Sequence, residues 1–279
     1  MSDQNDIGVI VGVRLSRVKP DCHKRLRAWL LWHQSADFKH LIIVDTSQNF
    51  LARRLMQKIC HEFKAHYIHQ PQKLHSPSAI RNTGMRFALS IGLTYGLFVD
   101  VDVLGQAGAM KALLEDVSND LDFNWYPVQF TSEDLSLTTM LNWAKSNPSE
   151  FTGNLDQIGY ATGIHLLSAQ AWKALSGYDE DFIGYGCEDI DMIHRASLTY
   201  GNRPPMTKEP SYYEDYRTRD LKKYRGYRKW MFEQKKDVLL SDMWIHFYHI
   251  RKPNSKYLKA RKENDILLAK KMEEFDEMQ

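Results

Sequence analysis

The chain of 279 residues has few cysteines and no strong excess of one charge. Its three cysteines, Cys22, Cys60 and Cys187, are odd in number and far apart, which argues against a disulfide scaffold and fits no zinc motif. We therefore expect reduced thiols in a cytosolic setting. A net charge of +2 gives no global argument for a nucleic-acid partner, and we expect none.

Long apolar runs and targeting signals are also missing. No run approaches the roughly 18 to 20 residues that span a bilayer, and the polar, acidic stretch from Met1 to Asp6 is unlike a signal peptide. These features predict a cytoplasmic protein. The hydrophobic share of 43% and the charged share of 26% are ordinary for a globular chain with one large domain or two small, closely packed ones.

The first third of the chain alternates between apolar strands and amphipathic helices. The predicted strands are Ile7 to Arg14, His40 to Asp45 and Ala65 to His69, and the predicted helices are Cys22 to Gln34 and Phe50 to Phe63. This rhythm predicts an α/β fold with a parallel, doubly wound sheet, in which ligands bind at the carboxyl ends of the strands. Arg14 and Asp45 lie at those ends, where a salt bridge that anchors the loop is the simplest interpretation.

Two aspartates follow the next apolar run, Tyr95 to Leu104. Because alternate residues of an extended strand share a face, we expect Asp100 and Asp102 to point together. Two carboxylates at the end of a buried strand are costly unless a cation or donors satisfy them, and oxygen ligands suit Mg²⁺ or Mn²⁺. The Asp-x-Asp pattern alone is a weak signal, because it occurs by chance in many proteins.

The stretch from Gly177 to Arg195 is predicted to be a glycine loop that runs into a helix. Gly184 and Gly186 allow backbone angles that residues with side chains avoid. Three carboxylates then crowd the first helical turn, where the helix dipole favours them. Capping alone needs fewer acids than Glu188, Asp189 and Asp191 supply.

Five further segments complete the candidate features. A helix is predicted after Ser76 and Pro77, and strands are predicted from Asn124 to Phe130 and from Tyr160 to Leu167. Basic and aromatic residues alternate from Tyr212 to Lys236, where a solvated helix is the favoured interpretation and contact with anionic lipid or an acidic glycan is the alternative. The stretch Met243 to Pro253 contains His246 and His249, each of which could equally be a core histidine.

Residues 177–195 resemble the second signature motif of the metal-dependent inverting glycosyltransferases of GT-A fold. This group includes the β-1,4-galactosyltransferases, the polypeptide N-acetylgalactosaminyltransferases and the bacterial chondroitin-polymerase-like capsule enzymes. The chain departs from the family pattern at Cys187 and Ile190 but retains Glu188 and Asp189. The resemblance extends over about residues 7–260, with Arg81 and the Asp-x-Asp pattern in the expected order.

The resemblance implies a GT-A fold, with a mostly parallel central sheet and helices on both faces. It further implies a single domain with a nucleotide-binding half (1–105), an acceptor half (106–205) and a C-terminal extension (206–279). Asp102 and His249 would hold Mn²⁺ or Mg²⁺, with His246 as an alternative ligand. Asp189 would act as the general base, Glu188 would orient a sugar, and Tyr185 would stack on a sugar face. The nucleotide would be held by Arg14, Asp45, Arg81 and Asp100.

The implied partners are a UDP-sugar donor and a saccharide or lipid-linked saccharide acceptor. Bacterial capsule or surface-polysaccharide synthesis is expected by analogy, with the protein in the cytoplasm or peripheral on the cytoplasmic face of the inner membrane. A nucleotidyltransferase that makes sugar nucleotides is the alternative enzyme. A non-catalytic module that binds nucleotide or sugar is the alternative outside enzymes.

Overall fold

Two β-sheets organise the chain in this computed structural model, which describes residues 6–16, 21–72, 74, 76–132, 137–145, 151–160, 162–200, 213, 221–249 and 259–277. The larger sheet has six strands in the order β3-β2-β1-β4-β9-β6. These strands are β1 (Ile7–Val13), β2 (His40–Asp45), β3 (His66–His69), β4 (Tyr95–Phe98), β6 (Phe123–Trp125) and β9 (His165–Ser168). Strands β1 to β4 are parallel, while β9 is antiparallel to both β4 and β6.

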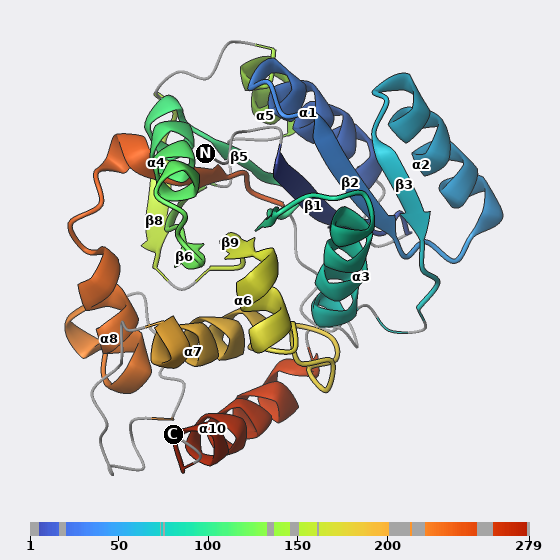
Figure 1. The fold of residues 1–279 in the computed structure, drawn as a ribbon. Coiled ribbons are helices and arrows are strands. Elements are labelled where there is room, and N and C mark those ends of the chain that lie inside the picture. Colours follow the sequence, from blue (N-terminus) through green and yellow to red (C-terminus); the bar gives the residue numbers. More distant parts are fainter. Residues whose placement is uncertain are drawn as a thin grey trace.

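Helices cover both faces of this sheet. The side chains of its central strands point alternately to the two faces, so each face has its own hydrophobic core. Helices α1 (Cys22–Ser35), α2 (Phe50–Glu62) and α4 (Ala107–Ser118) contribute to one core, with Val9, Val11 and Ile43 from the sheet. Helices α3 (Pro77–Ser90), α6 (Ala169–Ala174) and α7 (Glu188–Tyr200) contribute to the other, with Ile10 and Ile42 (Figure 1). The predicted α/β fold with a mostly parallel sheet and helices on both faces is confirmed.

The smaller sheet joins segments that are distant in the sequence. Its order is β5-β10-β7-β8, from the strands β5 (Val103–Gly105), β7 (Val128–Thr131), β8 (Leu155–Gly159) and β10 (Trp244–His246). Strand β10 is antiparallel to β5 and parallel to β7. Since β10 comes from the expected C-terminal extension and pairs with a strand of residues 1–105, the three expected parts share their sheets.

Three predicted strands are wrong in their extent. The run from Tyr95 to Leu104 is divided, because β4 ends at Phe98 and the chain turns before β5, with the amide of Val103 donating to the carbonyl of Asp100 at 3.0 Å. Pro127 lies between β6 and β7, where it divides the run from Asn124 to Phe130. Residues 160 and 162–164 are not strand, since the chain passes from β8 in one sheet to β9 in the other.

Apart from β10, the regular structure in the described residues of the C-terminal part is helical. Helix α5 (Leu137–Trp143) precedes it, and the short helices η3 (Leu221–Lys223) and η4 (Leu240–Asp242) flank α8 (Gly226–Lys235), while α10 (Arg261–Glu277) packs on α7 (Figure 1). Tyr227 and Trp230 are buried, as expected for a helix whose aromatic side chains pack on the body. Arg217 and Arg219, from the same basic segment, lie outside the described residues. No helix in the described ranges is long and apolar enough to cross a membrane.

Candidate active site

Asp102 and two histidines meet because of the register between β5 and β10. In that register His246 lies opposite Val103, and the next amide, that of Phe247, donates to the carbonyl of Asp102 at 2.8 Å. The pairing therefore places both ends of the short segment from His246 to His249 beside the turn that carries Asp102. His246 Nε2 lies 3.6 Å from Asp102 Oδ1, and His249 Nδ1 lies 2.6 Å from Asp102 Oδ2.

These three side chains have the chemistry of a divalent metal site. One possible ligand atom from each of them lies within 4.8 Å of the others. The Asp102 and His246 residues are buried, with 5% and 9% of their surface exposed, so their polar atoms face one another rather than bulk water. One carboxylate with two imidazoles is a mixed oxygen and nitrogen set that suits Mn²⁺ well and Mg²⁺ less well. The residues present thus fit the expected metal.

The two predicted aspartates do not share a face. The Asp100 side chain is 61% exposed and its Oδ1 lies 3.9 Å from Arg81 Nη2, whereas the Asp102 side chain is 7% exposed and points to the histidines. The expectation of alternating strand residues is wrong here because the chain turns at this point. Asp100 instead connects the metal-ligand cluster to a second group of charges.

The second group is a buried ion pair between α3 and the first turn of α7. Arg81 Nη1 lies 2.8 Å from Glu188 Oε1, and both side chains are less than one-tenth exposed. The other oxygen of Glu188, Oε2, is buried without a hydrogen-bond partner among the described residues. A buried polar atom without a partner is costly, and a ligand hydroxyl would satisfy it.

The neighbouring carboxylates of this turn have different surroundings. Burial and the negative charge of Asp189 raise the pKa of Glu188 to about 7, although Arg81 favours the charged form. Asp189 is half-buried, and its Oδ1 accepts a hydrogen bond from the amide of Ile190 at 2.9 Å. Asp191 is taken up by a pair with Arg195, whose Nη2 lies 2.7 Å from Asp191 Oδ2, as the spacing predicts. The accessible carboxylate of the three is therefore Asp189.

Sequence reasoning missed the residues that hold Arg81 in place. Its guanidinium lies over the ring of Tyr178, 5.1 Å from the centroid. The Tyr178 hydroxyl lies 2.8 Å from His165 Nδ1, and His165 Nε2 lies 2.7 Å from the carbonyl of Thr162. Burial, with the nearby charge of Arg81, lowers the pKa of His165 well below its usual value, so this histidine stays neutral. Gly163 was the available signal, since a Cβ there would lie 2.4 Å from Arg81 Nη2.

The predicted nucleotide-binding residues of the first two strands lie side by side in the sheet. Val13, which precedes Arg14, is paired in register with Asp45. The Asp45 carboxylate accepts from the Tyr67 hydroxyl and from the amide of Ser47, each at 2.8 Å. Asp45 therefore shapes the loop after β2 through Ser47 and Tyr67, while its salt bridge with Arg14 and its contact with nucleotide both stay predictions.

The glycine loop before α7 has the expected left-handed backbone. The φ angles are +84° at Gly184 and +86° at Gly186. Cys187, which replaces a glycine of the family pattern, also has a φ of +84°, a conformation that L residues rarely adopt. The loop thus retains the glycine-like geometry in spite of the substitution. Tyr185 is half-buried between the two glycines.

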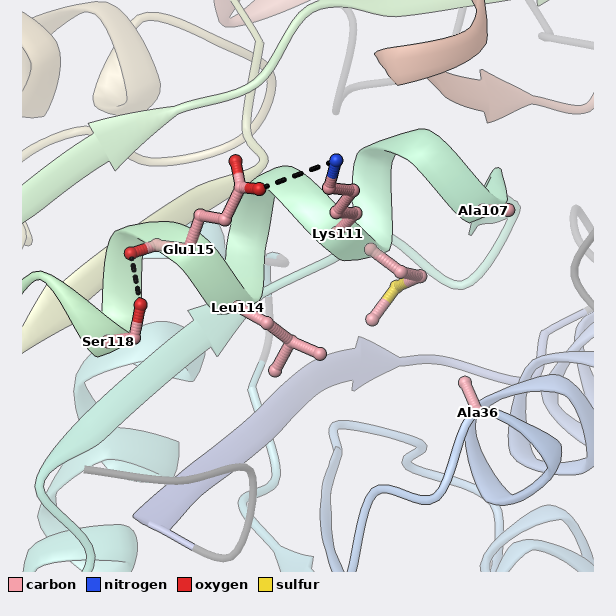
Figure 2. Close-up of a pocket in the computed structure, with 7 residues that line it drawn as sticks. Ala36, Ala107, Lys111, Leu114, Glu115 and Ser118 are labelled. Carbon is pink, nitrogen blue, oxygen red and sulfur yellow. Dashed lines mark hydrogen bonds and ion pairs between the residues drawn. The ribbon is translucent and has the colours of Figure 1, made fainter. Parts of the chain in front are cut away.

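A surface cavity of about 580 Å³ lies elsewhere, along α4 (Figure 2). Its charged side chains, Lys111 and Glu115, pair with each other at 3.6 Å. None of the predicted site residues lines it, and its wall is mainly apolar. Its lining residues are Ala36, Ala107, Met110, Lys111, Leu114, Glu115 and Ser118.

Comparison with family models identifies the family of this chain. The family model described as glycosyltransferase like family 2 matches residues 130–273, just over half of the 279 residues. The chain belongs to this family. The matched range contains the carboxylates of α7, His246 and His249 of this family-2-like protein, while Asp102 precedes it. A comparison with curated protein sequences found no match.

The solved structures that match this family-2-like protein have low sequence identity to it. The structure of TarS from S. aureus is 15% identical with a TM-score of 0.46, covering 69% of this chain and 33% of that chain. The present chain thus spans about a third of the TarS structure. The mannosyltransferase PcManGT from Pyrobaculum calidifontis, in complex with GDP-Man and Mn²⁺, is 13% identical with a TM-score of 0.45, covering 99% of this chain and 76% of that chain. Likenesses this distant say nothing of this protein's donor or acceptor.

Proposed function

We propose that this chain is a metal-dependent, inverting glycosyltransferase that moves a hexose or N-acetylhexosamine from a UDP-sugar to a saccharide or lipid-linked saccharide. The observation that carries the proposal is the meeting of Asp102, His246 and His249, whose possible ligand atoms lie within 4.8 Å of one another. Arg81, which pairs with Glu188, also approaches Asp100, two residues before Asp102. Family membership supports sugar transfer as the reaction class. Synthesis of a bacterial capsule or surface polysaccharide is the proposed setting, with peripheral membrane contact.

Asp102, His246 and His249 would hold Mn²⁺ or Mg²⁺. When bound, the metal supplies positive charge that offsets the negative charge of the leaving nucleotide. Arg14, Asp45 and Asp100 would contact the nucleotide. Arg81 would do so only beside its existing pair with Glu188, because that pair already takes one arm of its guanidinium.

The carboxylates of α7 would divide the remaining work. Asp189 would accept the proton of the attacking hydroxyl, since it is the more accessible of the two acids. Glu188 would bind and orient a sugar hydroxyl through Oε2, the buried oxygen without a partner. Tyr185 would stack on a sugar face. A single base and a single displacement invert the anomeric centre.

The proposal is tested by measuring release of the nucleotide from UDP-GlcNAc, UDP-Gal, UDP-Glc and GDP-Man in the presence of simple saccharide acceptors. We expect turnover with one UDP-sugar, loss of turnover with EDTA and recovery with added Mn²⁺. Binding of UDP with Mn²⁺ should raise the melting temperature by mass action. No thermal response to any nucleoside diphosphate would contradict the proposal, and binding without turnover would favour the non-catalytic module.

The Asp189→Asn variant tests the base. A positioned general base contributes about 10²- to 10⁴-fold, so kcat should fall by that factor while binding of UDP and Mn²⁺ stays unchanged. Glu180→Gln is the matched control, because Glu180 is exposed on the same loop. Unchanged transfer by Asp189→Asn would remove the base assignment without affecting the metal site.

A further inference from the structure

We propose that Asn264, near the start of α10, is a positioning residue for the loop that carries Tyr185 and leads into the catalytic carboxylates. The inference rests on the proposed transferase function. Asn264 is 4% exposed, and α10 lies beside α7 (Figure 1). Its Nδ2 lies 3.1 Å from the carbonyl oxygen of Ile183, 3.3 Å from that of Tyr185 and 3.0 Å from that of Gly186.

The chemistry of these contacts makes the amide difficult to replace. A carbonyl oxygen only accepts hydrogen bonds, and the –NH₂ group of asparagine is the donating end of its side chain. The two hydrogens of one buried –NH₂ group are therefore shared among three carbonyl oxygens of a loop that forms neither strand nor helix. An aspartate of the same shape would direct a negative oxygen at the same carbonyls, which would repel it.

The loop needs such support because its backbone is unusual. Gly184, Gly186 and Cys187 all have φ angles between +84° and +86°, and the cysteine adopts this region against its preference. Loop geometry of this kind persists only when the surroundings fix it. Since Glu188 and Asp189 follow directly, the direction of the loop determines where the first turn of α7 begins.

Other residues of α10 hold the same loop along its length. The Arg261 guanidinium lies over the Tyr185 ring, 5.7 Å from the centroid, and its Nε lies 2.6 Å from Asp265 Oδ1. The Cys187 thiol donates to the same Asp265 oxygen at 3.2 Å. Lys271 pairs with Asp179 and Asp181 near the start of the loop. The C-terminal helix thus contacts the loop at several points along its length.

The test compares Asn264→Asp with Lys270→Gln in the full chain. Both changes lower the net charge by one on the same helix, but Lys270 is exposed and pairs only across one turn with Glu274. Three quantities are measured: hydrogen exchange of the amides of residues 183–187, affinity for UDP with Mn²⁺, and the rate of UDP release from the accepted UDP-sugar. For Asn264→Asp we expect exchange at least about 10-fold faster and turnover about 10²-fold lower, with nucleotide affinity within about two-fold. Lys270→Gln should change none of them.

Each outcome decides the proposal. Unchanged exchange in the loop, or faster exchange with unchanged turnover, would overturn it. Equal loss of nucleotide affinity and turnover would also overturn it, since that pattern reports a smaller folded fraction rather than a displaced loop. If Asn264→Asp shows no cooperative melting transition, the neutral variant Asn264→Ser is measured in its place. If the unmodified chain turns over no UDP-sugar, the proposed function fails, while exchange still decides whether Asn264 fixes the loop.

Discussion

The Asp102 cluster and the loop of residues 183–189 lie in one network of contacts but are held by different means. The cluster depends on backbone pairing between β5 and β10, which continues into the bond from the Phe247 amide to the Asp102 carbonyl. The loop depends on side chains, chiefly those of Arg81 and Asn264. Strand register holds a set of ligands rigidly. The conformation of a loop that individual side chains hold changes when any one of them is replaced.

This difference has a chemical reason. A metal site requires a few ligands at fixed distances, and sheet pairing supplies such distances with little dependence on neighbouring side chains. In the proposed function the loop binds an acceptor sugar, and side-chain contacts can be altered one at a time to suit that acceptor. The predictions below test whether the two regions respond as separately as their construction indicates.

The largest effect is expected for Asp102→Asn. The variant keeps the size of the side chain but removes the negative charge of the metal ligand. Loss of the metal's stabilisation, several kcal/mol, should lower turnover by about 10³-fold or more and abolish Mn²⁺-dependent binding of UDP. Calorimetric titration with UDP and Mn²⁺ measures the binding, and Asp237→Asn, at an exposed position, is the control. Exchange in the loop should stay as it is, and a change there would show that the two regions are not separate.

A large stability effect is expected for Arg81→Met. At pH 8, above the raised pKa of Glu188, removing its partner leaves an uncompensated buried charge, which costs about 3–5 kcal/mol in free energy of unfolding. Arg86→Met on the same helix is the control, because the Arg86 side chain is 54% exposed and its pair with Glu180 should contribute less than about 1 kcal/mol. Urea denaturation measures both variants. An equal loss of unfolding free energy in the two variants would show that the Arg81–Glu188 pair does not hold the loop.

The dependence of stability on pH should show a further property of this pair. The pKa of Glu188 is raised from 4.5 to about 7, mainly by burial, so between these values the folded chain keeps a proton that the unfolded chain loses. The favourable contribution is complete below about pH 4.5 and is lost as the pH rises through about 7. The free energy of unfolding should therefore fall across this window, by at most about 1.4 kcal/mol per pH unit.

Glu188→Gln provides the comparison for this slope. A glutamine does not titrate, so the difference in free energy of unfolding between the two proteins should itself change between pH 5 and pH 8. Urea denaturation at four pH values measures it, with the exposed Glu180→Gln as a control that should follow the unmodified chain. Parallel curves for Glu188→Gln and the unmodified chain would show that Glu188 is charged throughout.

The parallel half of the fold could be predicted from the sequence because its signals are local. The run from His40 to Asp45 is apolar and bounded by polar residues, and the observed β2 has these bounds. Ser76 caps α3, its hydroxyl accepting from the Ala79 amide at 3.3 Å, with Pro77 in the first turn as expected. Such patterns depend on neighbouring residues alone.

The errors occurred where long-range pairing decides the structure. Nothing near Val99 indicates that the chain must turn before Val103, because the turn serves pairing with β10, far along the chain. The Arg81–Glu188 pair and the bonds from Asn264 likewise join segments separated by more than seventy residues. Family resemblance named Asp102 and the carboxylates of α7, but their partners depend on the assembled fold.

A further question about the proposed metal site is whether His246, His249 or both act as ligands. The sequence left the two as alternatives, while the structure places His249 Nδ1 at 2.6 Å and His246 Nε2 at 3.6 Å from oxygens of Asp102. The ring of His246 also packs on Phe130 of the paired strand β7, with centroids 4.7 Å apart, so a neighbouring strand of the smaller sheet holds it in place. We expect both histidines to act as ligands.

The variants His246→Gln and His249→Gln separate the possibilities. Loss of either ligand should weaken Mn²⁺ affinity by about 10- to 100-fold, measured by paramagnetic resonance of free Mn²⁺ in the presence of UDP. His61→Gln, outside the cluster and exposed on α2, is the control. If affinity falls only for His249→Gln, His246 is a neighbour that supports Phe130 rather than a ligand. In that case strand register alone would not build the metal site, because the one histidine ligand of this cluster would come from the irregular segment after β10, and the contrast with the loop would weaken.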